Sequence, residues 1–352
     1  MGVMKKMTGN RGREQSWLAR KWKNEPLFST GIALLVMSLI QIAVLIWKRS
    51  PPDMQAFMDL WAGNWRNILV NNASVGIIAL GMTLVIISGG IDLAVGSTLV
   101  GVGTLVMVMI DTGPKGVLGN MGITGVPAYA IAIASGLVLG ALFGGANGVL
   151  VTRGNVPPFI ATLGAMKIIR SVTQHYMQQY TPAVPKEFLQ LASFQVGGQI
   201  ILPAVYWLLL AIALHIVSRH TAFGRHVYAV GSNERTTRLS GINVNWVKTR
   251  VYMLMGLIVS IAAVVQTSRM GSMDPANAGL GYELDAIAAV IVGGTSMAGG
   301  RGSIAGSVIG MLIIGVMNNL LNLVGVPAFL REAFKGAIVI FAVLLQRKRA
   351  EN

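Results

Sequence analysis

Residues 68–88 read ILVNNASVGIIALGMTLVIIS, a run of 21 residues without a charged side chain. A helix that crosses the ~30 Å hydrocarbon core of a bilayer needs about 20 mostly apolar residues. This stretch therefore predicts a membrane-spanning helix. Nine further apolar segments are spread along the chain, at about residues 28–47, 94–110, 126–151, 157–172, 201–218, 251–268, 286–299, 304–323 and 331–346.

The composition of the chain also indicates a protein that is embedded in a lipid bilayer. Of its 352 residues, 53% are hydrophobic and only 12% are charged, with a mean hydropathy of +0.64. A soluble globular chain carries about 25% charged residues, so this chain has too little polar surface for water. We predict an all-α, polytopic transmembrane helical bundle with about ten spans. Segments 157–172, 286–299 and 331–346 are short, which makes them candidates for tilted, broken or re-entrant helices.

Basic residues predict the orientation of the bundle. If the N-terminus is cytoplasmic, the cytoplasmic segments hold 18 Lys and Arg and the outer loops hold 6. Cytoplasmic loops of membrane proteins are enriched in these residues, so we expect both termini inside and an even number of spans. The net charge of +15 has the same origin, and no nucleic-acid partner is expected, because the basic residues lie between apolar runs.

The segments divide the chain into four parts without a soluble domain. We assign residues 1–27 to a basic cytoplasmic segment and 28–65 to a peripheral first span with its outer loop. Residues 66–346 form the transmembrane domain, which includes a hydrophilic inner loop at 219–250, and 347–352 form a cytoplasmic tail. The first apolar run is long enough to span and has no small-residue cleavage site, which disfavours a cleaved signal peptide.

The inner loop predicts a short cytoplasmic helix. Asn233, or Ser232 before it, can cap the start of this helix, and Glu234 suits its first turn. Gly241 can end it in the left-handed conformation. About two turns of helix are marginal in isolation, so the helix needs a docking surface, either lipid headgroups or a soluble partner. Three further side chains would be carried on it: Arg235, Arg238 and Leu239.

Polar side chains inside the apolar segments are candidates for lining a path for a polar solute. The competing interpretation is that they bond across helices, at about 0.6–2 kcal/mol each. The candidates are Asn71, Asn72, Asn147, Asn318 and Asn319, together with Thr83, Thr162 and Asn322.

Charged residues at segment ends have two interpretations each. Asp92, near the inner ends of the second and third segments, either gates a path or caps the third segment. Glu283 and Asp285 stand at the outer start of the eighth segment, where they either cap a helix or contact an external protein. Lys167 and Lys335 are expected to extend their ammonium groups to the membrane interface.

Several function classes find little support in the sequence. An ion-coupled secondary transporter, the main alternative to an ATP-driven one, needs ionisable groups near the membrane centre, whereas the acids fall in loops or at segment ends. No histidine pair has metal-site spacing, no catalytic grouping suggests a membrane-embedded enzyme, and Cys is absent. No ATP-binding signature occurs, so any ATP hydrolysis would belong to another chain.

Six strings carry a family resemblance. They are GGIDLAVGS at 89–97, PFIATLG at 158–164, TAFGRHVYAVGSNE at 221–234, RLSGI at 238–242, and YELDAIAAVIVGG at 282–294 followed by GGRGS at 299–303. In this order and spacing, over about residues 66–346, the chain resembles the permeases of ATP-binding-cassette importers for ribose, galactose and xylose.

The resemblance implies a set of partners and roles. Two copies of the chain would enclose a central path in the bacterial inner membrane, and a periplasmic sugar-binding protein would deliver a pentose or hexose, with Glu283 and Asp285 as its contacts. Two ATPase subunits would use ATP and Mg in the cytoplasm, and residues 233–241 would form the coupling helix that they move. The chain itself would be a transport subunit that binds no cofactor.

Overall fold

The structure is a computed structural model that describes residues 26–178 and 180–350. Each of the ten predicted segments overlaps a helix, which confirms the helical prediction. These helices are α2 (Pro26–Arg49), α3 (Met54–Ile87), α4 (Val95–Ile110), α6 (Gly125–Thr152), α7 (Pro158–Met177), α9 (Leu202–His220), α12 (Val244–Met270), α13 (Tyr282–Val292), α14 (Ile304–Val324) and α15 (Ala328–Ala350). Most of the predicted segment 1–27 and the last two residues of the tail lie outside the described residues.

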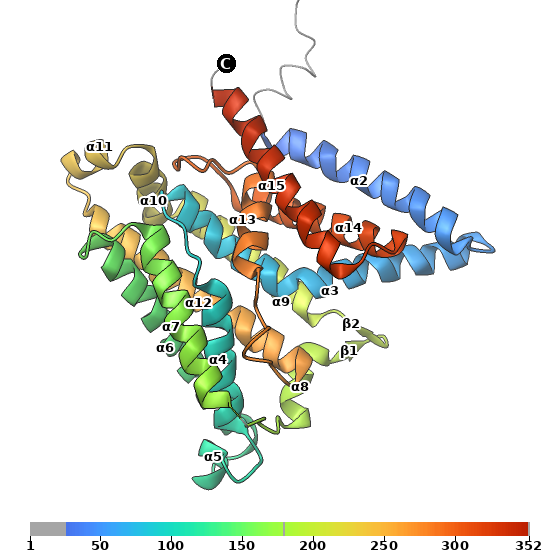
Figure 1. The fold of residues 1–352 in the computed structure, drawn as a ribbon, viewed down its shortest axis with the longest axis horizontal. Helices are drawn as coiled ribbons and strands as arrows, with labels where there is room; N and C mark the ends of the chain where they lie inside the picture. The colour runs from blue at the N-terminus through green and yellow to red at the C-terminus, as the bar shows by residue number, and fades with distance from the viewer. Residues whose placement is uncertain (1–25, 179, 351–352) are drawn as a thin grey trace, which may run out of the picture.

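The connections contain shorter elements that the apolar pattern did not predict. They are α5 (Val117–Asn120), α8 (Lys186–Ser193), the antiparallel hairpin of β1 (Gln195–Val196) and β2 (Gln199–Ile200), α10 (Ala222–Ser232) and α11 (Glu234–Leu239). Figure 1 shows α10 and α11 at one end of the bundle and α5, α8 and the hairpin at the other. The hairpin is the one departure from an all-α fold in the described part of the chain.

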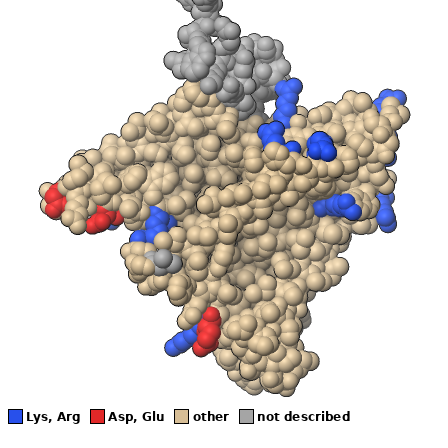
Figure 2. Space-filling view, turned by 180° about the vertical axis from the view of Figure 1, so that it is seen from behind, with Lys and Arg blue, Asp and Glu red and all other residues tan. Residues whose placement is uncertain are grey.

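Six described helices, α2, α3, α6, α9, α12 and α14, are long and apolar enough to cross a membrane. This length and composition support a polytopic membrane protein, although the predicted number of about ten spans is larger. Figure 2 shows that the charged side chains visible on one face gather mainly toward its edges and leave a broad uncharged belt between them. Such a belt suits the hydrocarbon core of a bilayer.

The predicted segment 286–299 is wrong in its second half. Helix α13 has only 11 residues, which gives a length of about 16 Å and cannot cross the hydrocarbon core alone. It ends at the pair Gly293 and Gly294, and Gly294 has a φ of +90° that side chains other than glycine rarely adopt. The backbone then runs without helix to Ser303, which caps α14. The expectation of a broken helix is confirmed for this segment.

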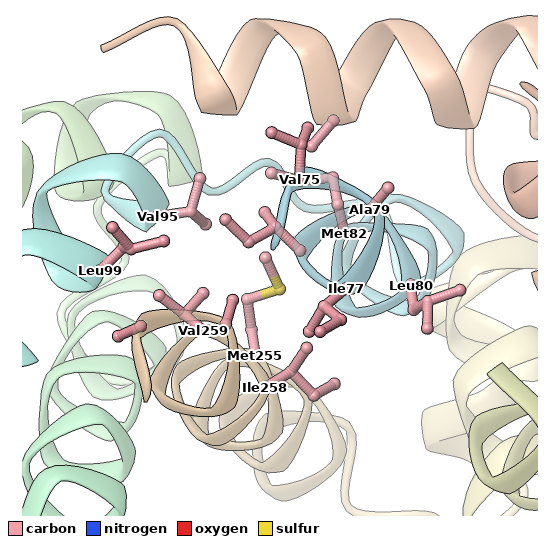
Figure 3. Packing of buried hydrophobic residues seen from close by; sticks show 14 of the residues in the cluster. Val75, Ile77, Ala79, Leu80, Met82, Val95, Leu99, Met255, Ile258 and Val259 are labelled. Atoms are coloured by element: carbon pink, nitrogen blue, oxygen red, sulfur yellow. The ribbon is translucent and has the colours of Figure 1, made fainter. Parts of the chain in front are cut away.

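Helix α3 lies at the centre of the core. Its most apolar window is 89% buried, against 22% for the windows of α6 and α9, whose outer faces remain available to lipid. Figure 3 shows Met255 of α12 between Ile77 of α3 and the pair Val95 and Leu99 of α4. The three helices therefore share one hydrophobic cluster, which holds the broken segments in place.

Helices α6 and α12 approach each other through glycine. A Cβ on Gly144 would collide with the carbonyl oxygen of Tyr252, and one on Gly256 would collide with the carbonyl oxygen of Gly140. Small residues allow such backbone contact between membrane helices, where packing and not exclusion of water drives association. Gly140, Gly144 and Gly256, three of the 43 glycines in the chain, make this contact possible.

The close contact gives a stability prediction. We expect Gly144→Ala to destabilise the protein by about 1–3 kcal/mol, because the new methyl group forces α6 away from α12. The thermal midpoint of unfolding in detergent measures the effect. Gly145→Ala is the matched control, since a Cβ there meets only the Met253 side chain, at 3.6 Å. Equal midpoints for the two variants would contradict the proposed role of Gly144.

Candidate functional site

The predicted inner helix is present as α11. The Asn233 side chain caps it by accepting a hydrogen bond from the Thr236 amide at 2.9 Å, so Asn233 and not Ser232 is the cap. Gly241 follows with a φ of +82° and turns the chain out of the helix. These local signals were sufficient because capping needs only neighbouring residues.

Helix α11 stands out from the bundle. Apart from Thr237 its residues are exposed, and the Leu239 side chain is 82% exposed. Arg235 and Arg238 are exposed beside it. Figure 1 shows α11 at the far end of the molecule, beyond α10. An apolar tip with flanking cations can dock on a partner or on a lipid surface, as expected from the sequence.

An ion-pair network links α11 to α12. The Glu234 carboxylate accepts from Arg238 at 3.1 Å within the helix and from Lys248 Nζ at 2.6 Å in the first turns of α12. Lys248 was not predicted, because its spacing of 14 residues from Glu234 follows no local pattern. The pair joins α11 to a membrane helix, so the short helix does not depend on its own stability.

Helix α10 connects α11 to the bundle. The Tyr228 hydroxyl donates to the Gly302 carbonyl at 2.9 Å, and the Gly300 amide donates to the Ile87 carbonyl at 2.9 Å. Gly231 lies so close to Ile87 that a Cβ would collide with the Ile87 carbonyl oxygen. We call this meeting of α10, the end of α3 and the 293–303 connection the inner junction.

Asp92 lies in the connection between α3 and α4 and is buried. Its carboxylate accepts from the Ala94 amide at 2.8 Å, while Ala94 itself occupies the N-cap position of α4. Asp92 therefore closes the turn before the helix and is not its cap residue, contrary to the capping interpretation. Tyr252 supports this turn by donating to the Ile91 carbonyl at 3.2 Å.

Helices α3, α14 and α15 bring several of the predicted path residues together. Asn71 and Asn72 of α3 and Asn318 and Asn319 of α14 line one cavity of about 310 Å³. It lies at the end of the bundle opposite α11, because the paths of α3 and α14 lead from the inner junction to it. We call it the asparagine cavity.

Other candidate path residues lie elsewhere. Asn147 is buried on α6, outside the asparagine cavity. Thr83 shares a hydrogen bond of 2.6 Å with Ser307 and so joins α3 to α14. Thr162 donates to the Pro158 carbonyl of its own helix at 2.8 Å. The two threonines show the structural bonding that competes with a path-lining role.

The acids at the start of α13 are engaged within the protein. Asp285 pairs with Lys335 of α15 at 3.0 Å, and Lys335 also bonds Glu332 at 2.8 Å. Lys335 was expected to reach the membrane interface, but its side chain is only 16% exposed and is held between two carboxylates. Neither Glu283 nor Asp285 caps α13, because Gly281 occupies the N-cap position. Both acids are partly buried, so a smaller part of each carboxylate is exposed to an external partner than the sequence predicted.

The sequence model of a family described as branched-chain amino acid transport system / permease component matches residues 64–343. This chain belongs to that family of membrane permeases. The ribose import permease protein of Escherichia coli strain K12 is 41% identical over 319 residues, which cover 89% of this permease and 93% of the relative. No solved structure matches the chain.

Two further relatives confirm the resemblance to sugar permeases. The ribose import permease protein of Bacillus subtilis strain 168 is 43% identical over 293 residues, or 82% of this chain and 85% of the relative. The D-allose transport system permease protein of Escherichia coli strain K12 is 33% identical over 310 residues, or 88% and 90% of the two chains. The permease matches these relatives over nearly their whole length.

The Glu234 network gives the permease a pH-dependent contact. The hydrogen bond from Lys248 lowers the pKa of Glu234 below its ordinary value of 4.5, while burial acts in the opposite direction. A carboxyl group with a lowered pKa in the folded state adds stability that is fully present above its unfolded pKa. That stability is lost as the pH falls through the folded pKa.

We therefore expect α11 to remain attached to α12 at pH 4.5 and to loosen only at lower pH. A spin label on Leu239→Cys reports this attachment as reduced mobility in its resonance spectrum. Lys248→Met should make the label mobile already at neutral pH. Arg235→Met, which removes a cation without a bond to Glu234, should leave the spectrum unchanged; a label equally mobile in both variants would refute the role of Lys248.

Proposed function

We propose that this permease is the membrane-spanning subunit of an ATP-driven importer for a monosaccharide, in the bacterial inner membrane. The observation that carries the proposal is the 41% identity to a ribose import permease over 89% of the chain. The relatives are named as permeases, so the chain is a transport subunit rather than an enzyme. The ion-coupled transporter considered from the sequence finds no support among them.

The orientation that we propose puts α10 and α11 in the cytoplasm, both termini inside, and about ten helical segments at membrane depth. The threefold excess of Lys and Arg on that side supports it. Of these segments, α4 and α13 are too short for full spans. Helix α4 packs against α6 and α12, and α13 packs against α3 and α14, so neighbouring helices shield their ends from lipid.

An ATPase subunit is the partner that we propose for α11. It would bind the exposed surface formed by Arg235, Arg238 and Leu239, with ATP and Mg bound by the ATPase and none by this chain. A rigid helix moves as a unit where a loose loop would absorb the motion. The Glu234 network links α11 to α12, and the inner junction is the contact through which movement of α11 would reach α3 and α14.

At the outer end we propose a docking site for a sugar-binding protein and a path built by two copies of the chain. Glu283 is the more available acid for that docking, because Asp285 is already paired with Lys335. Asp92 and Asn147 are buried within the single chain, so a path between two copies would reach either of them only after the surrounding helices move. The asparagines of the outer cavity lie nearest to the arriving sugar.

Reconstituted transport tests the proposed function. We expect proteoliposomes with this permease, the ATPase and the sugar-binding protein of the same importer to accumulate radiolabelled sugar from a panel of ribose, allose and xylose. Accumulation should require ATP and persist when a protonophore removes the proton gradient. Uptake that ignores ATP but collapses with the proton gradient would favour the ion-coupled alternative.

The coupling role of α11 has its own test. Gly241→Pro, which cannot adopt the positive φ at this position, and the double variant Glu234→Ala with Arg238→Ala should both uncouple the complex. We expect uptake to fall at least tenfold while ATP hydrolysis by the reconstituted complex continues. Glu234→Ala alone should have a smaller effect. Full uptake in all variants would contradict coupling through α11.

A further inference from the structure

The asparagine cavity is built differently from the rest of the membrane domain. Six of its lining residues are asparagines: Asn67, Asn71, Asn72, Asn318, Asn319 and Asn322. An asparagine in lipid normally bonds to a neighbouring helix at a small gain, which explains one or two such residues but not six around one space. The cavity of about 310 Å³ falls at the lower end of the range for small-molecule sites.

Some of the amides hold the walls of the cavity. Asn319 exchanges hydrogen bonds of 2.7 and 3.0 Å with Asn64, and its carbonyl oxygen also accepts from Gln41 at 2.9 Å. Asn71 accepts from Arg269 of α12. These bonds connect α14 to α2 and α3, and α3 to α12, so the wall is built before any ligand arrives.

Other amides remain available. The carbonyl oxygen of Asn318 is buried and has no hydrogen-bond partner within the described residues. Asn67 and Asn322 are exposed into the space they line. A buried polar atom without a partner costs about 1–3 kcal/mol, so a rotation of the Asn318 side chain that brings this covered oxygen to a donor group on a ligand would be favourable.

The charges at the rim favour a ligand without net charge. Lys335 pairs with both Asp285 and Glu332, and together with Arg331 the two cations balance the two carboxylates, so the rim carries no net charge. Arg331 is the one lining cation that pairs with no acid within the described residues, and its guanidinium can donate to hydroxyl oxygens as well as to anions.

The contact of α14 with α3 sets the depth of the cavity. Gly315 faces Asn72, and a Cβ added to Gly315 would lie 3.0 Å from the Asn72 amide nitrogen and 2.9 Å from the Ile68 side chain. Both neighbours line the cavity. A methyl group at Gly315 would therefore push them into the space that a ligand needs.

From these observations we propose that the asparagine cavity is a monosaccharide-binding site within the permease itself, occupied after the sugar leaves its binding protein. Amides supply both donors and acceptors, as hydroxyl groups require, and Ile68 and Ala328 offer apolar surface to the C–H groups of the ring. This inference rests on the proposed sugar transport.

Direct binding to the permease alone tests the inference. Purified permease in lipid nanodiscs, without ATPase or binding protein, should bind radiolabelled ribose, allose or xylose saturably in equilibrium dialysis. Asn318→Leu and Gly315→Ala should each weaken that binding about three- to tenfold, the loss of one or two hydrogen bonds. Asn322→Leu, a substitution at an exposed helix position that the fold tolerates, should weaken it in the same range.

Two matched controls separate the cavity from general damage. Asn120→Leu removes an asparagine from the α5 region, and Gly164→Ala adds a methyl group where none of the protein lies within 4 Å. Both should bind as the wild type does. Unchanged binding in all three cavity variants would overturn the inference, and so would tighter binding of ribose 5-phosphate than of ribose, which would show an anion site at Arg331.

The outcome is distinguishable from failure of the proposed function. If the same nanodisc preparation shows no saturable sugar binding, yet the reconstituted complex imports sugar with ATP, the cavity is not a binding site although the permease function stands. If the wild-type complex does not import any sugar of the panel with ATP, the proposed function itself fails.

Discussion

The hydrogen bond from the Gly300 amide to the Ile87 carbonyl marks the point on which the rest of the structure depends. Here the last turn of α3, the irregular chain between α13 and α14, and helix α10 meet without side chains between them, because Gly231 and Gly300 leave no room for a Cβ. Backbone groups at membrane depth must find partners within the protein. The inner junction satisfies this need and at the same time attaches the cytoplasmic helices to the core.

The sequence predicts much of the fold because the decisive signals are local. A run such as residues 68–88 identifies a membrane helix by its own composition, and Asn233 and Gly241 identify α11 by capping within one turn. Local sequence signals could not predict two ion pairs, Glu234 with Lys248 and Asp285 with Lys335. Each joins residues from different elements, and nothing in their spacing indicates the contact.

The asparagine cavity shows the same limit at a functional site. The asparagines were recognised as candidates one by one, yet Asn72 and Asn318 are 246 residues apart in sequence, and only the fold brings Asn71 and Asn72 next to Asn318. In lipid an unpaired amide is costly, which favours a hydrogen bond from each asparagine to a neighbouring helix. Which amides pair and which stay free is decided by tertiary geometry, and the free ones matter for binding a sugar.

The two ends of the permease are joined by the same two helices. Helix α3 ends at Ile87 in the inner junction, and Asn72 lies 15 residues earlier, about 22 Å along the axis. Helix α14 begins next to Gly302 in the junction, and Asn318 lies about 21 Å from its start. A displacement of α11 that tilts these helices at the junction must also change their separation at the cavity, because a buried helix packed along its length moves as a rigid rod. Mechanical work from an ATPase would thereby reach the proposed sugar site through α3 and α14 themselves.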